Sequence, residues 1–286
     1  MTTPVVDSHL HVWDLERSAY AWLGPGHGEL YRSFTPGEAE DVLRTAGISA
    51  AVLVQAEDST TDTELMLEAA ENSDVIAGVV GWVRLDDPDT ALEQLSRYDD
   101  ESAFRGVRHL VHDDPRGDFL ELEEVRRSLG LLAERGLPFD VPDAWPRHLA
   151  RLPDLAEAVP ELVLVIDHLG KPPLGSAALE DWAAALRSVA ARSNTFAKVS
   201  GLQVPGRPFT SAELRPVWEV ALDCFGPSRL MYGGDWPMTV PQGGYQAHWL
   251  PVRALVDELS IDEQAQILSG TAIRTYRLQL GAGDDQ

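Results

Sequence analysis

Short apolar segments recur along the chain, and each has the length of one buried β-strand. They are rich in Val, Ile and Leu and lie at residues 5–12, 50–56, 76–83, 106–111, 137–141, 162–166, 195–199 and 230–233. Strands that are apolar throughout are covered on both faces, as in a parallel sheet. The pattern therefore predicts eight buried parallel strands.

Segments with a helical spacing of apolar residues separate these strands. The clearest lie at residues 61–71, 90–98, 121–135, 179–192 and 211–224. Several begin after Ser, Thr or Asp, whose side chains cap helices. Alternating strands and helices predict right-handed βαβ units, and eight such units form a closed (β/α)8 barrel, the α/β fold called a TIM barrel. Residues 262–280 are expected to form an extra C-terminal helix that closes the barrel.

The main alternative to the barrel is an open, doubly wound sheet. Sheets of that kind often carry a glycine-rich phosphate loop after the first strand, and no such loop follows residues 5–12. The length of 286 residues also suits a single barrel, which typically needs about 250. We therefore expect one domain that spans residues 1–286.

The charge of the chain limits its partners. Lys and Arg number 23 and Asp and Glu 46, which gives a net charge of −23. Such a field repels phosphate backbones and anionic lipid surfaces, which argues against nucleic acids and membranes. The single cysteine, Cys224, excludes an internal disulfide and fits a reducing compartment. We expect a cytoplasmic protein that acts on a small molecule, and the sequence does not indicate its oligomeric state.

A His-x-His motif ends the first strand, in the segment DSHLH at residues 7–11. Side chains alternate along a strand, so Asp7, His9 and His11 are expected on one side, with the two imidazoles roughly 7 Å apart along the backbone. Two such imidazoles could hold a cation. Barrel closure brings the last strand beside the first, so Asp235 could add a metal ligand or take a proton from water. The alternative is that the two histidines only form hydrogen bonds in the core. The presence of Asp235 on the last strand favours a catalytic or metal-binding role instead.

His168 ends the sixth strand and could extend this site. It could be a further metal ligand, or it could polarise a substrate carbonyl from the side opposite the first strand. We favour the second role. The sequence therefore assigns His168 and Asp235 as catalytic residues.

Other polar and aromatic residues at strand ends are candidates for substrate contacts. Arg108 and Lys198 lie on apolar strands, where a buried cation needs an anionic or oxygen-rich partner. That partner could be the substrate or an internal carboxylate such as Asp7 or Asp140. Lys171 is either a binding residue or an ordinary exposed lysine. Gln55 joins this group, and an apolar wall could be formed by Trp13, Tyr20, Trp22, Trp82, Trp145 and Trp236.

These motifs together resemble the amidohydrolase superfamily, and within it the lactonase-type branch that includes sugar-lactone hydrolases and 2-pyrone-4,6-dicarboxylate lactonase. The resemblance covers nearly the whole chain. The most specific segments are VDSHLHVWD at residues 6–14, KVSGL at 198–202 and GGDWP at 233–237, and DHLGKP at 167–172 supports them.

The resemblance implies a (β/α)8 barrel that hydrolyses a small cyclic ester, with His9, His11, His168 and Asp235 at its centre. It leaves the metal open, because members of this branch differ in whether they need one. The histidine that the superfamily carries on its fifth strand is absent here, where the strand continues as FDVPDAWP at residues 139–146. We therefore expect either one divalent cation, zinc or manganese, or none.

The sequence therefore predicts a hydrolase that opens a small cyclic ester, in particular a sugar lactone. Two alternatives remain at this point. Related barrels use a similar His-x-His and Asp frame to decarboxylate aromatic or enol acids. A non-catalytic barrel that only binds a metabolite is the other.

Overall fold

The computed structural model describes residues 4–280. Its strands are β1 (Val6–Leu10), β2 (Ala50–Val54), β3 (Ile76–Gly81), β4 (Phe104–Arg108), β5 (Phe139–Val141), β6 (Leu164–Ile166), β7 (Thr195–Val199) and β8 (Leu230–Tyr232). Each strand pairs in parallel with the next, in the order β1 to β8. Beyond β8, the backbone N–H of Asp235 donates to the oxygen of His9 at 2.7 Å and brings the last strand beside the first. The predicted TIM barrel is confirmed.

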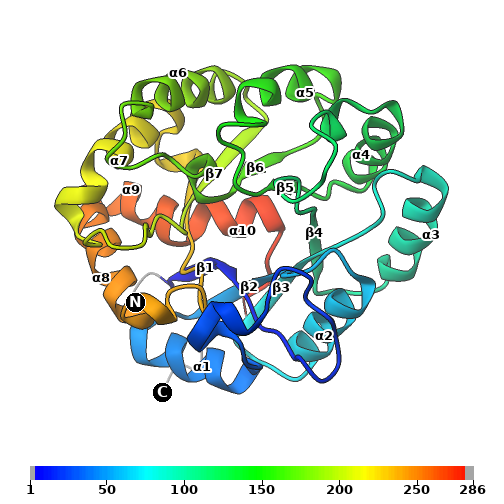
Figure 1. The fold of residues 1–286 in the computed structure, drawn as a ribbon, viewed down its shortest axis with the longest axis horizontal. Coiled ribbons are helices and arrows are strands. Elements are labelled where there is room, and N and C mark those ends of the chain that lie inside the picture. The colour runs from blue at the N-terminus through cyan, green and yellow to red at the C-terminus, as the bar shows by residue number, and fades with distance from the viewer. Residues whose placement is uncertain (1–3, 281–286) are drawn as a thin grey trace.

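Helices form a ring around the strands (Figure 1). Those expected from the sequence are confirmed to within a few residues, as α2 (Thr60–Glu71), α3 (Pro88–Tyr98), α4 (Glu123–Arg135), α6 (Leu179–Ala190) and α7 (Ser211–Phe225). The ring also includes α1 (Pro36–Ala46), α5 (Leu152–Ala158) and α8 (Gly244–Val256). Within the described residues, no helix is both long and apolar enough to cross a membrane.

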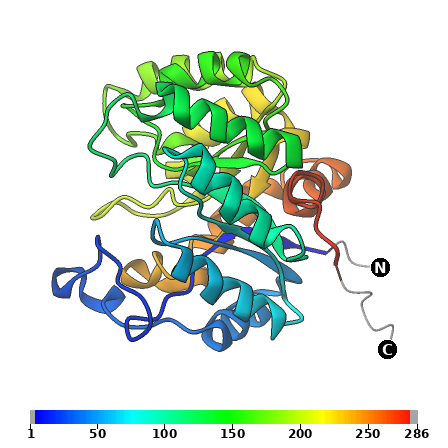
Figure 2. The ribbon, with the colours of Figure 1, turned by 90° about the vertical axis from the view of Figure 1, so that its right-hand side faces the viewer.

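The last helices of the described chain close the barrel, as the sequence predicted. α9 (Ile261–Ala265), a π-helical segment at residues 266–270 and α10 (Thr271–Tyr276) follow one another without a break. Figure 2 shows these helices, in red, on the side opposite the loops that follow the strands. Their apolar side chains pack on the inward-facing side chains of the strands, in a cluster that includes Val6, Val52, Val165 and Met231. These side chains therefore fill the barrel at the amino-terminal ends of its strands.

Tyr276 of α10 ties this closing helix to a buried carboxylate. Its hydroxyl lies 2.9 Å from both carboxylate oxygens of Asp140 on β5, and both side chains are almost fully buried. The substitution Tyr276→Phe should lower the free energy of unfolding by about 1–3 kcal/mol, because the carboxylate loses a buried donor. Urea unfolding measures this. Tyr98→Phe, which removes a hydroxyl with no hydrogen bond in the described chain, should cost less, and equal losses would contradict the account.

Candidate active site

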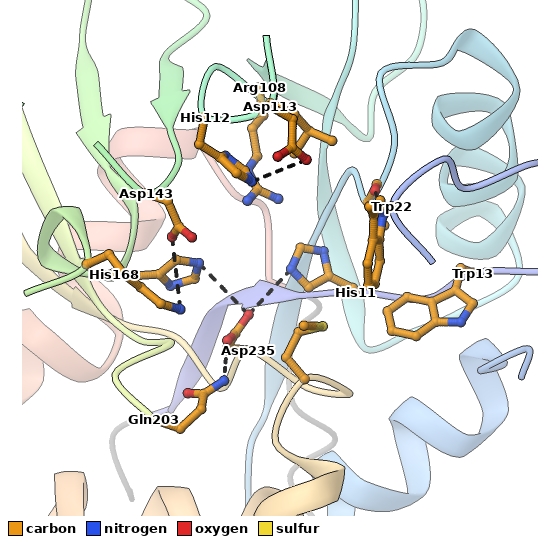
Figure 3. Close-up of a pocket in the computed structure, with 14 residues that line it drawn as sticks. His11, Trp13, Trp22, Arg108, His112, Asp113, Asp143, His168, Gln203 and Asp235 are labelled. Atoms are coloured by element: carbon orange, nitrogen blue, oxygen red, sulfur yellow. Dashed lines mark hydrogen bonds and ion pairs between the residues drawn. The ribbon is translucent and has the colours of Figure 1, made fainter. Parts of the chain in front are cut away.

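A pocket of about 170 Å³ opens at the carboxyl ends of the strands, where barrel enzymes place their chemistry. Figure 3 shows Asp235 between His11 and His168, with Gln203 beside it and Trp22 and Trp13 along one wall. The residues come from loops after several different strands, as the sequence indicated. The barrel itself therefore brings together side chains that are more than 200 positions apart.

His9 and His11 converge on one point with Asp235. Their Nε2 atoms lie 3.1 Å apart, and the Asp235 Oδ1 atom is 3.8 Å from His9 Nε2 and 3.5 Å from His11 Nε2. Two nitrogen ligands of one tetrahedral zinc ion would lie about 3.3 Å apart. All three side chains are buried. Nitrogen and carboxylate donors in this arrangement therefore fit a single divalent cation such as zinc or manganese.

Asp7 does not join these two histidines, contrary to the expectation from strand alternation. The register of β1 against β2 shifts between Asp7 and Leu10, so the regular alternation of side chains is broken there. The Asp7 carboxylate instead accepts hydrogen bonds from the hydroxyl of Tyr245 on α8 at 2.7 Å and from the N–H of Gly234 at 2.8 Å. It therefore anchors the turn that follows β8.

Contacts behind the two imidazoles fix their orientation. His11 Nδ1 lies 2.7 Å from the carbonyl oxygen of Val54, which can only accept, so this nitrogen donates and His11 Nε2 carries the lone pair. His9 Nδ1 lies 3.1 Å from Lys198 Nζ and 3.3 Å from Asp167 Oδ1. Burial lowers the pKa of His9 well below its usual value. His9 is therefore neutral near pH 7.

Asp235 is held as a carboxylate at the centre of the pocket. Gln203 Nε2 donates to its Oδ2 atom at 2.9 Å, and its Oδ1 atom faces the two β1 histidines. Burial opposes ionisation, but the imidazoles of His168, His11 and His9 around the carboxylate bring the pKa of Asp235 below its usual value. An ionised carboxylate with one oxygen free of strong partners can accept a proton from water.

His168 faces Asp235 across the pocket. Its Nε2 atom lies 4.0 Å from Asp235 Oδ1, and its Nδ1 atom lies 2.9 Å from Ser200 Oγ. Burial lowers the pKa of His168 to about 4, so the ring is neutral near pH 7. Gly201 lies against this ring, and a Cβ atom there would approach His168 Nδ1 to 2.2 Å. The close approach explains the glycine in the segment KVSGL.

Several pocket residues adopt left-handed backbone conformations, which are uncommon for residues other than glycine. The φ angles are 42° for Asp143, 56° for His168, 63° for Lys171 and 50° for Asp235. Such strain persists only where the surrounding structure imposes it, and it concentrates at functional sites. The loops after β5, β6 and β8 are therefore shaped to present these side chains to one pocket.

Arg108 and Lys171 line the pocket, as the sequence suggested. Arg108 also has internal partners. Its Nε atom lies 3.1 Å from Asp167 Oδ2, and its Nη1 atom donates to the backbone carbonyl oxygen of Gln55 at 2.9 Å. Lys171 is 38% exposed, and its Nζ atom lies 4.0 Å from Asp143 Oδ1. Both cations can therefore reach a ligand without being left unpaired in its absence.

Lys198, Gln55 and Trp236, expected to contact substrate, are not among the residues that line the pocket. Lys198 is fully buried one layer below, with its Nζ atom 2.5 Å from Asp140 Oδ2, so its partner is an internal carboxylate. The Gln55 amide donates to Asp58, and the Trp236 ring packs edge-on against Phe34. Strand position does not give the depth of a side chain in the barrel, and for Lys198 the structure shows the internal carboxylate partner that the sequence had left open.

Several lining residues were not predicted as site residues, namely Gln203, His112, Asp113, Asp143 and Met238. They lie in loops, where no periodicity marks the side chains that face inward. Asp143 belongs to the segment at residues 139–146, whose departure from the family pattern was the one sequence feature that could have pointed to it. Trp13 and Trp22 of the expected aromatic wall do line the pocket.

A family profile, curated sequences and solved structures all relate this chain to amidohydrolases or lactonases. A profile of the family described as Amidohydrolase matches residues 6–278. The chain is 32% identical to an L-fucono-1,5-lactonase of Burkholderia ambifaria, over 98% of this chain and 97% of that protein. It is 33% identical to an L-fucono-1,5-lactonase of Burkholderia multivorans, with 96% of each covered. A crystal structure of an amidohydrolase from Burkholderia multivorans with bound zinc has a TM-score of 0.86 and 30% identity, over 96% of this chain and 100% of that chain.

Proposed function

The chain belongs to the amidohydrolase family, and we propose that it is a lactonase that opens a small cyclic ester, a sugar lactone, with an activated water. The observation that carries this proposal is the buried Asp235 carboxylate, which meets His9 and His11 on one side and faces His168 on the other. The curated relatives named L-fucono-1,5-lactonase, similar over nearly their full length, support the lactone as substrate class. Such a substrate belongs to carbohydrate metabolism.

His9, His11 and Asp235 would hold one divalent cation, zinc or manganese. The zinc in the Burkholderia multivorans structure supports this assignment. A divalent cation at these ligands would act as a Lewis acid and lower the pKa of water.

The residues of this chain account for the proton transfers of ester hydrolysis. Asp235 Oδ1 accepts a proton from water while Gln203 holds the other carboxylate oxygen. The water oxygen forms a bond to the lactone carbonyl carbon, and the carbonyl oxygen becomes an oxyanion. His168 stabilises that oxyanion by donating from Nε2, which requires Ser200 Oγ to donate to Nδ1. The bond from the carbonyl carbon to the ring oxygen then breaks, and the ring oxygen takes the proton from Asp235.

The pocket wall suits a small ring with several hydroxyl groups. Arg108 and Lys171 present N–H donors, and the indole of Trp22 provides an apolar face. Both cations already have carboxylate neighbours, Asp167 and Asp143, so the wall carries little net positive charge for a strongly anionic substrate. A neutral polyhydroxylated lactone fits this balance better than a dicarboxylate.

Metal content follows from the two possible ligand groups in the described residues, His9–His11–Asp235 and His9–Asp167–His168, which share His9. Purified protein that has never contacted a metal-affinity tag should contain one zinc or manganese ion or fewer per chain, because the fifth-strand histidine of a binuclear site is absent. Elemental analysis by mass spectrometry measures the content after dialysis. Two tightly held ions per chain would contradict a single site.

Screening of sugar lactones with a pH indicator tests the function, with and without added zinc or manganese. Proton release that depends on enzyme, without carbon dioxide, is the result expected of a lactonase. Carbon dioxide release from an aromatic or enol acid would favour the decarboxylase. Binding without turnover across the panel would favour a non-catalytic barrel.

A further inference from the structure

Lys198 contacts His9 from within the barrel core and is fully buried. Its ammonium group has three N–H donors and no acceptor. Three acceptors surround it, the Asp140 Oδ2 atom at 2.5 Å, the Asp167 Oδ1 atom at 3.1 Å and the His9 Nδ1 atom at 3.1 Å. Two of these contacts are hydrogen bonds, to Asp140 Oδ2 and to His9 Nδ1, and the contact with Asp167 Oδ1 is an ion pair without hydrogen-bond geometry.

This contact determines which nitrogen of His9 carries the proton. A neutral imidazole that accepts at Nδ1 must carry its proton on Nε2. That proton points to His11 Nε2, 3.1 Å away, which accepts because His11 donates from Nδ1 to the carbonyl oxygen of Val54. Hydrogen bonds thus run in one direction from Lys198 to Val54, and each group in the series has a suitable partner.

The same arrangement works against metal binding. A histidine ligates a metal through a nitrogen lone pair, and a proton on His9 Nε2 removes the lone pair that faces His11 and Asp235. We propose that Lys198 is a positioning residue that holds His9 in the tautomer unable to bind metal, and so restrains the occupancy of the cation site. This inference rests on the cation site of the proposed function, but not on the lactone.

Cation binding then requires a defined rearrangement. The His9 proton leaves Nε2 and is replaced on Nδ1, and Nδ1 donates to Asp167 Oδ1, now 3.3 Å away. Lys198 keeps its three protons and gives up its hydrogen bond to His9, while Asp140 and Asp167 continue to neutralise it. No proton is gained or lost overall. Loss of the hydrogen bond between Lys198 and His9 therefore makes the free energy of cation binding less favourable.

A variant that tests this must keep the buried charges balanced. Lys198 and Arg108 face Asp140 and Asp167, so the four charges sum to zero. Lys198→Met alone leaves an excess carboxylate in the core and could fail to fold. The double variant Lys198→Met with Asp140→Asn restores the balance, because Arg108 still pairs with Asp167. Asp140→Asn alone, which keeps the lysine, is the matched control.

Zinc affinity is measured on the full-length metal-free chain by competition with a chromophoric chelator. The double variant should bind zinc at least ~10-fold more tightly than wild type, since a charged hydrogen bond no longer opposes the required tautomer. Asp140→Asn alone should not bind more tightly than wild type. Lys171→Met removes a nearby positive charge that makes no contact with His9, and should change the affinity less than about threefold. An equal gain in Lys171→Met, or no gain in the double variant, would overturn the proposal.

The tautomer itself can be observed without metal or substrate. Nitrogen-15 NMR of metal-free protein, with His9 assigned by comparison with His9→Asn, should show a protonated Nε2 in wild type and a protonated Nδ1 in the double variant. A protonated Nδ1 in wild type would overturn the proposal. Because neither readout involves lactone turnover, failure here is distinguishable from failure of the proposed function.

Discussion

The substitution Asp235→Asn should lower kcat for lactone hydrolysis by at least ~100-fold, which is the lower end of what a positioned general base contributes. The amide keeps the shape of the side chain and can still contact Gln203, but it cannot accept the proton of water. Initial rates with the best lactone of the panel give kcat and KM. Circular dichroism establishes that the variant is folded.

A second carboxylate-to-amide change controls for this result. Asp87 caps the start of α3, where its carboxylate accepts from Thr90, and it lies outside the pocket. Asn caps helices as well as Asp does, so Asp87→Asn should leave kcat within about twofold. A kcat for Asp235→Asn near that of wild type would show that another group is the base.

The substitution His168→Asn should lower kcat by about 100- to 1,000-fold, as loss of an oxyanion donor does in other enzymes. Asn tolerates the left-handed backbone that His168 adopts, at a φ of 56°, so the loop after β6 should keep its shape. KM should change much less than kcat, because the lost contact forms with the transition state. Steady-state kinetics measure both constants.

The matched control is Arg277→Asn, at a surface position with a φ of 50° that follows α10. This variant also introduces Asn at a left-handed backbone position, but at the opposite end of the barrel from the pocket. Its kcat should therefore equal that of wild type. If His168→Asn alters KM alone, His168 binds substrate in the ground state and does not stabilise the oxyanion.

The sequence predicted the fold well because each strand and helix repeats a local pattern. Eight apolar segments and the helices between them are visible without any knowledge of contacts. The positions of His9, His11, His168 and Asp235 followed from the rule that barrel chemistry lies at strand ends. The structure brings these four side chains together: His11, His168 and Asp235 line the pocket, and His9 lies fully buried beside them.

Asp7 was placed on the wrong side because alternation assumes an unbroken strand. One register shift in β1 turns that carboxylate toward α8, and no residue in the segment signals the shift. Lys198 shows a second limit. The sequence places it on a barrel strand, but only the packing of β5, β6 and β7 shows that Asp140 and Asp167 enclose it below the pocket.

Gln203 shows a third limit of prediction from sequence. It lies in the loop after β7, and its contact with Asp235 depends on how two loops meet above the barrel. Loop side chains have no period that could identify the inward-facing ones. Such residues become visible only when the whole set of strand ends is assembled.

Hydrolysis in water enriched in oxygen-18 tests the central claim most directly. If Asp235 activates water for attack on a lactone carbonyl, each turnover places one labelled oxygen in the carboxylate of the hydroxy-acid product. Mass spectrometry should show that label in the product of the wild-type enzyme, with no carbon dioxide, and incorporation should be at least ~100-fold slower in Asp235→Asn. Release of carbon dioxide, or an enzymatic product without the label, would contradict the account.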